Sequence, residues 1–123
     1  MSISELAKQY NSFQENFCKT CEADLADVIS GLFEDKFQKI ANGAVLVANR
    51  NGLADQLSEV KNIAGKWALD VKDIIPSRDD KKCTIRYVIS TEKAGKFDVL
   101  AVLSSNNGMQ ISKIDELFYQ IGQ

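Results

Sequence analysis

Hydrophobic and polar residues are arranged differently in the two halves of this 123-residue chain. In the second half, short runs rich in β-branched and aromatic residues are separated by turn-forming residues, a pattern typical of strands joined by hairpins. The four runs are Leu69–Pro76, Cys83–Thr91, Phe97–Ser104 and Met109–Gln120. The second half therefore predicts an antiparallel meander.

The first half instead has apolar side chains in steps of three and four, the spacing of amphipathic helices. Ser2 and Glu5 form a capping box, so a first helix should begin there and run to about Cys18. Thr20 is the expected N-cap of a second helix, and Leu53–Trp67 predicts a third. The expected buried faces are Ile3, Leu6, Tyr10, Phe13 and Phe17 in the first helix, Leu25, Val28, Ile29, Leu32 and Phe33 in the second, and Leu53, Leu57, Val60, Ala64 and Trp67 in the third.

A hairpin is expected between the second and third helices. Asn42-Gly43, a strong signal for a two-residue turn, lies between Phe37–Ala41 and Ala44–Arg50. The order is then two helices, two strands, one helix and four strands. It predicts one α+β domain over residues 1–123, with a curved sheet wrapped around the helices.

Composition narrows the range of partners. Fifteen basic and seventeen acidic side chains give a formal charge of −2 without a basic stripe, so nucleic acid is not an expected partner. No apolar run approaches the ~20 residues that span a bilayer, and Met1–Gln14 does not resemble a signal peptide. Three cysteines, an odd number, fit free thiols in a reducing compartment. We therefore expect a cytoplasmic protein without a membrane partner.

Three motifs, in this order of elements, resemble the nuclear transport factor 2-like superfamily, in particular its SnoaL-like branch. Leu32-Phe33-Glu34-Asp35 is similar to the family's exit from its second helix, and Asn51-Gly52 is similar to the entry to its third. The segment 107–114 (NGMQISKI) is similar to the D-G-K-I-x-x-I entry to its last strand. The resemblance covers nearly the whole chain. It implies a cone in which N-terminal helices pack on a strongly curved, mainly antiparallel sheet around a pocket, and dimers formed through the convex sheet face.

The resemblance also implies several reactions, but the residues for them are missing here. Isomerase-type proton transfer would need a carboxylate at Ala41. It would also need hydrogen-bond donors at Ala101 and at Phe13 or Phe17. Epoxide-hydrolase-like members use an Arg-x-Asp pair, and Arg86 lacks that aspartate. Dehydratase-like members rely on histidine, and the chain has none, so any acid or base must be Asp, Glu, Tyr, Lys or Cys.

Glu116 is the remaining candidate for an acid or base. Strand alternation places it on one face with Ile114 and Phe118, and the resemblance implies that this face is concave. Among aromatic neighbours its pKa would rise, as a general base requires. The alternative is that Glu116 forms an ordinary ion pair with Arg86 or Lys113, or lies at the open end of the sheet.

Cys18 and Cys21 form a C-x-x-C pattern between the first two helices. A thioredoxin-type motif would follow a strand instead, and zinc would need ligands beyond Cys83. We interpret the pair as free, unreactive thiols and keep a redox module as a further alternative. No phosphate-binding glycine-rich loop is present, so neither a metal nor a cofactor is expected.

The sequence thus predicts an apolar pocket in which small residues, Ala41 and Ala101, leave room for a ligand. The expected lining is Tyr10, Phe13, Phe17, Phe33, Trp67, Tyr87, Val99, Ala101, Ile114, Glu116 and Phe118. We expect a non-catalytic domain that binds a small hydrophobic molecule or serves in assembly. The alternative is an isomerase, dehydratase or cyclase that uses Glu116 with Tyr10 or Tyr87.

A homodimer is expected from the strand Phe97–Ser104. One face of this strand is wholly apolar, and the other carries Leu100 and Val102 beside Asp98 and Ser104. Because the helices can cover only one face of the sheet, the apolar residues on the other face need a second copy as cover.

Overall fold

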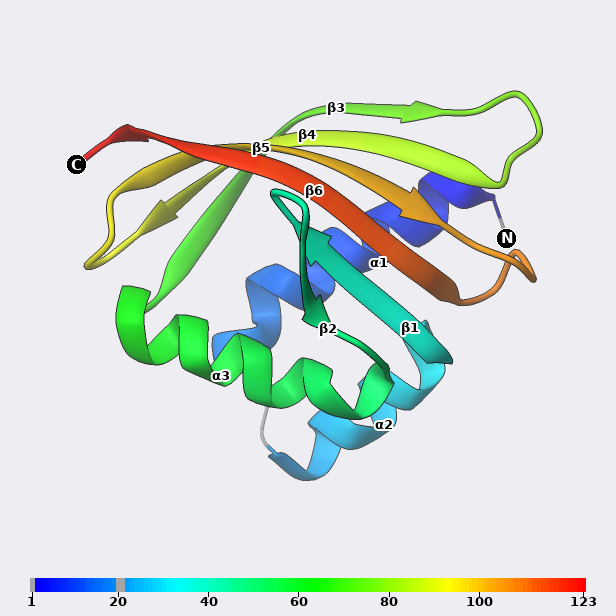
Figure 1. The fold of residues 1–123 in the computed structure, drawn as a ribbon, viewed down its shortest axis with the longest axis horizontal. Helices are drawn as coiled ribbons and strands as arrows, with labels where there is room; N and C mark the ends of the chain where they lie inside the picture. Colours follow the sequence, from blue (N-terminus) through cyan, green and yellow to red (C-terminus); the bar gives the residue numbers. More distant parts are fainter. Residues whose placement is uncertain (1, 20–21) are drawn as a thin grey trace.

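A computed structural model of the chain describes residues 2–19 and 22–123 (Figure 1). The elements are α1 (Ile3–Asn16), a 3-10 turn (Phe17–Lys19), α2 (Glu22–Leu32), β1 (Phe33–Ala41), β2 (Ala44–Val47), a second 3-10 turn (Arg50–Gly52), α3 (Leu53–Ala64), β3 (Trp67–Pro76), β4 (Lys82–Thr91), β5 (Lys96–Ser104) and β6 (Ile111–Gly122). Thr20 and Cys21, the expected helix cap and the second thiol of the C-x-x-C pattern, lie outside the described residues. Within those ranges, no helix combines the length and the apolar character that crossing a bilayer requires.

The six strands form one open sheet in the order β2-β1-β6-β5-β4-β3. Neighbouring strands are antiparallel except β1 and β6, which run parallel. The helices lie on one side, under the arch of the sheet (Figure 1). There α1 packs on β3 and β4, α2 on β1, and α3 on β2. A bulge between Val71 and Asp73 bends β3. The predicted α+β class is confirmed.

The sequence signals for helix starts and turns are also borne out. Ser2 Oγ accepts a hydrogen bond from the Glu5 N–H at 3.2 Å, as a capping box requires. Asn42 and Gly43 both have positive φ, 49° and 84°, the conformation of a tight hairpin turn. All five expected side chains of the first helical stripe are buried. Val28 is an exception in the second helix: it is 42% exposed, because it borders an open groove between α1 and α2.

Several element boundaries differ from the prediction. Strand β2 ends at Val47 and not at Arg50, and β6 runs over Ile111–Gly122 and not over Met109–Gln120. The third helix ends at Ala64, because Gly65 adopts φ 74°, where a Cβ would lie 2.8 Å from Glu92 Oε1. Trp67 therefore belongs to β3 and not to the helix. The first strand begins at Phe33, directly after α2, and not at Phe37.

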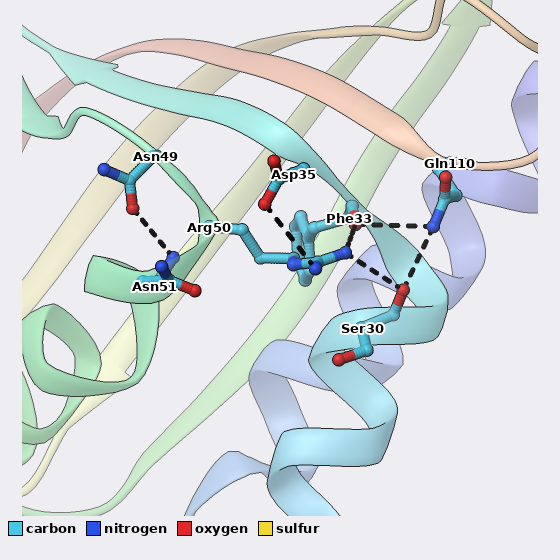
Figure 2. A network of polar contacts seen from close by, with 7 residues as sticks. All are labelled: Ser30, Phe33, Asp35, Asn49, Arg50, Asn51 and Gln110. Carbon is cyan, nitrogen blue, oxygen red and sulfur yellow. Dashed lines mark hydrogen bonds and ion pairs between the residues drawn. The ribbon is translucent and has the colours of Figure 1, made fainter.

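Side chains from two distant segments hold this direct junction between α2 and β1 (Figure 2). Arg50 Nη1 donates to the carbonyl oxygens of Ser30 and Phe33 at 3.4 and 3.2 Å. Gln110 Nε2 donates to the same two oxygens at 3.0 and 3.4 Å. Carbonyls at a helix C-terminus lack partners within the helix, so these donors allow the strand to begin without a connecting loop.

The outer face of the sheet remains partly apolar. Leu100 on β5 and Leu117 on β6 face each other across the strands and are 45% and 60% exposed. Beside them Arg86 forms an ion pair with Asp98 at 2.9 Å, and the Tyr119 hydroxyl donates to the same carboxylate at 3.3 Å. This face combines an apolar patch with a polar network, as many interfaces do.

We propose that a second copy of the chain covers this patch. Leu117→Lys should then convert a dimer into a monomer, because it places a charge at the centre of the interface. Met109→Lys, in an exposed turn, is the matched control and should leave the mass unchanged. The measurement is light scattering at micromolar concentration. A wild-type mass of 13.6 kDa would contradict the proposal.

Candidate functional site

A cavity of about 260 Å³ lies between α3 and the inner face of the sheet. From α3, Leu57, Val60 and Ala64 contribute to its wall. Most of the remaining wall is aromatic and aliphatic and comes from β3, β4, β5 and β6. Because α3 lies across a sheet that arches away from it, the space is not filled by side chains of the main core.

The structure brings five of the predicted site residues to this cavity. They are Trp67, Tyr87, Val99, Glu116 and Phe118. The other six are buried in the core outside the lining: Tyr10, Phe13, Phe17, Phe33, Ala101 and Ile114. Ala101, which we expected to leave room, is fully buried between its cross-strand neighbours Ile85 and Glu116. The cavity instead borders the next pair of cross-strand neighbours, Val99 on β5 and Phe118 on β6.

The aromatic core fixes one end of the cavity. Trp67 stacks on Phe17, with ring centroids 6.1 Å apart and an angle of 12° between the planes. Its indole Nε1 donates to the Gln14 carbonyl oxygen at 2.8 Å. The Tyr87 hydroxyl donates to Gln14 Oε1 at 3.3 Å. These contacts tie α1 to β3 and β4 and orient both aromatic side chains.

Sequence reasoning missed four polar residues of the lining, Gln14, Lys39, Gln56 and Thr91. Lys39 is only 5% exposed, and its Nζ donates to Gln56 Oε1 at 3.3 Å. The sequence contained a signal for the burial of Lys39, because it lies between Phe37 and Ala41 at the alternate positions of β1 that face inward. Gln14 likewise lies one helical turn after Tyr10 on the buried stripe of α1.

Glu116 also lines the cavity and is 7% exposed. Burial raises the pKa of its carboxyl above the ordinary value of 4.5, and the positive charge of Lys39 offsets part of this rise. The expected ion pair between Glu116 and Arg86 is wrong, because Arg86 faces the outer side and pairs with Asp98. Lys113 also occupies an outward position, beside Ser104.

Two phenol groups lie near Glu116: Tyr87 in the cavity lining and Tyr10 in the adjoining core. Burial raises the pKa of Tyr10 and that of Tyr87, and the nearby Glu116 raises both further. Both side chains therefore stay neutral and keep their O–H donors at neutral pH. Among the described residues, the Tyr10 hydroxyl and Gln14 Nε2 are buried without a hydrogen-bond partner.

The two thiols that the structure describes, Cys18 and Cys83, give no further site. Cys83 is buried, and burial raises the pKa of its thiol, which disfavours the reactive thiolate. Cys18 follows α1 in the 3-10 turn and is half-buried. That Cys18 and Cys21 are unreactive stays a prediction.

Comparison with known proteins identifies the fold. No family model matches the sequence, and none of the curated proteins is similar to it. Among solved structures, an NTF2-like protein of unknown function from Exiguobacterium sp. 255-15 is 17% identical, with a TM-score of 0.76 over 94% of this chain and 99% of that one. A cystatin-fold protein from Novosphingobium aromaticivorans is 20% identical, with a TM-score of 0.72 over 98% and 99%. A proposed isomerase of the SnoaL-like family from Agrobacterium tumefaciens is 8% identical, with a TM-score of 0.75 over 94% and 95%. The chain therefore has the nuclear transport factor 2-like fold that the sequence motifs implied.

The raised pKa of Glu116 makes a prediction about stability. The folded state favours the protonated carboxyl of Glu116. Its contribution to the free energy of unfolding is therefore fully present below about pH 4.5, the pKa of the unfolded state, and is lost as the pH rises through the pKa of the folded state. Relative to Glu116→Gln, the free energy of unfolding of the wild type should fall over this range, by about 1.4 kcal/mol for each unit of pKa shift. Urea unfolding between pH 4 and pH 8 measures it. Asp115→Asn, which removes a carboxyl at the exposed neighbouring position, is the matched control, and a pH-independent difference for Glu116→Gln would refute the assignment.

Proposed function

We propose that this protein is a non-catalytic binding domain that takes a small, mainly apolar molecule into the cavity beneath α3. The observation that carries the proposal is a preformed space of about 260 Å³ whose walls are largely apolar. Largely apolar cavities with a few polar groups are typical of sites for small molecules. The volume is slightly below the usual range, so the ligand should be smaller than a typical drug molecule.

The rim of the cavity supports the same interpretation. Ile63 on α3 is 74% exposed, and Leu46 on β2 and Phe118 on β6 are also exposed at its edge. A ligand that covers these side chains gains about 25 cal/mol for each Å² of apolar surface that it buries. The polar residues Gln14, Lys39 and Glu116 would then select its orientation rather than supply most of the affinity.

A second candidate function is proton transfer by Glu116. The observation that favours it is a buried carboxyl with a raised pKa near two neutral phenol donors, Tyr10 and Tyr87. A base and hydrogen-bond donors for a developing oxyanion are the groups that an enolisation needs. Among proteins with this fold, one is a proposed SnoaL-like isomerase and another a proposed polyketide cyclase from Sinorhizobium meliloti.

Filling the cavity tests the binding proposal. Ala64→Leu adds three carbon atoms to the wall, so it should weaken binding of naphthalene or indane at least tenfold, as NMR titration would measure. Ala68→Leu, on the exposed surface of β3, is the matched control and should bind both probes like the wild type. Thermal unfolding checks that both variants are folded. Equal affinity of the Ala64→Leu variant and the wild type would place binding elsewhere.

Isotope exchange separates the two candidates. A non-catalytic domain should not accelerate exchange of the α-hydrogens of 1-indanone with deuterated water, followed by proton NMR. Acceleration by the wild type that is lost in Glu116→Gln, while indanone still binds, would establish the second candidate instead.

A further inference from the structure

Lys39 is the one lysine of the described residues that faces into the cavity. The other lysines are exposed, apart from Lys113, which is half-buried and directed outward. No carboxylate of the described residues lies within 4 Å of Lys39 Nζ, and its observed partner is the neutral Gln56 amide. The Lys39 side chain is only 5% exposed and lines a largely apolar cavity. The fold therefore places a primary amine where it can act as a nucleophile.

Glu116 lies on the same face of the sheet as this amine and lines the same cavity. Parallel pairing of β1 with β6 sets Lys39 opposite Ile114 and Ala41 opposite Glu116, so the two ionisable residues are diagonal neighbours on the same face. Both line the cavity, and the charge of Lys39 acts on the Glu116 carboxyl. Burial makes that carboxyl a better proton acceptor than an exposed glutamate, which supports the same role.

We propose that Lys39 captures a small hydrophobic aldehyde or ketone in the cavity as a reversible imine. This inference rests on the proposed function, because the carbonyl compound must first enter the cavity. It assigns the ligand a chemical class, an apolar body with one carbonyl group, and it gives Lys39 and Glu116 distinct roles.

The reaction balances with the groups present. The Glu116 carboxylate takes a proton from the Lys39 ammonium, and the neutral amine attacks the carbonyl carbon to form a carbinolamine. Glu116 then returns the proton to the hydroxyl group, which leaves as water while the C=N bond forms. The product is a protonated imine on Lys39, and Glu116 is again a carboxylate. Because the walls are largely apolar, they disfavour the water that would hydrolyse the imine.

Reductive trapping tests this reaction. The protein is incubated with limiting benzaldehyde and sodium cyanoborohydride, and the rate of labelling at each lysine is measured by peptide mass spectrometry. Lys39 should be labelled at least tenfold faster than Lys36, the exposed lysine on the same strand. Lys39→Met should lose the fast labelling and keep the slow labelling elsewhere. Equal rates at Lys39 and Lys36 in the wild type would overturn the proposal.

Variants of the surroundings test where and how the labelling occurs. Glu116→Gln should slow labelling of Lys39 about tenfold, whereas Asp115→Asn should not. Ala64→Leu should slow it as well, because the cavity is smaller. If Lys39 is labelled at the wild-type rate in both Glu116→Gln and Ala64→Leu, the reaction does not use the cavity, and the proposal fails. Circular dichroism confirms that each variant is folded.

Binding of toluene, which has nearly the shape of benzaldehyde but no carbonyl group, separates this inference from the proposed function. If NMR shows that toluene enters the cavity while Lys39 is not labelled preferentially, the imine is refuted and the binding function stands. If neither toluene nor benzaldehyde enters the cavity, the binding function is refuted together with the imine.

Discussion

The packing of aromatic side chains around Phe33 is the interaction on which the rest of this structure depends. Its ring lies 6.1 Å from that of Tyr10, 5.2 Å from that of Phe13 and 4.6 Å from that of Phe37. These contacts join α1 to the first strand, although α2 lies between them in sequence. Aromatic pairs in such tilted and edge-to-face geometries contribute about 0.5–1.5 kcal/mol each beyond the area that they bury. They fix the position of α1, and the Gln14 contacts to Trp67 and Tyr87 follow from that position.

This arrangement also explains why a space remains beneath α3. The aromatic residues of α1 fill the inner face of the sheet near β3 and β4, and α2 covers the start of β1. The helix α3 meets the sheet through β2, at the far edge. The sheet bends between these contacts, so the side chains of α3 do not reach those of β5 and β6 everywhere.

The buried polar residues of the cavity, among them Lys39 and Glu116, destabilise the folded state in a way that an apolar core would avoid. Burying Glu116 removes hydration from its carboxyl, and the attraction of Lys39 recovers only part of that loss. The unpartnered Tyr10 hydroxyl and Gln14 amide nitrogen add to it. Unfavourable polar groups are concentrated at functional sites because binding or chemistry makes use of them. The fold itself hosts many functions, so the case for this site rests on its own residues.

Local patterns in the sequence determined the order of elements and most of the buried residues. The capping box at Ser2, the Asn42-Gly43 turn and the helical stripe of α1 each depend on neighbours within a few positions, and each was predictable. The ends of α2 and α3 were less predictable from the sequence. Strand β1 begins at Phe33 because Arg50 and Gln110 bind the junction from distant segments, which no local pattern records.

The candidate site was decided mainly by tertiary structure. Alternation along β6 correctly placed Glu116 on the inner face. Lys39 lies near Glu116 only because β1 pairs with β6 in parallel, which no local pattern predicts. Ala101 has the small side chain that a pocket needs, yet it is fully buried outside the lining, and the space lies at Val99 instead. A sequence specifies which side chains face inward, because that depends on local periodicity. Where those side chains fail to fill the interior depends on how distant elements meet, and only the folded chain determines that.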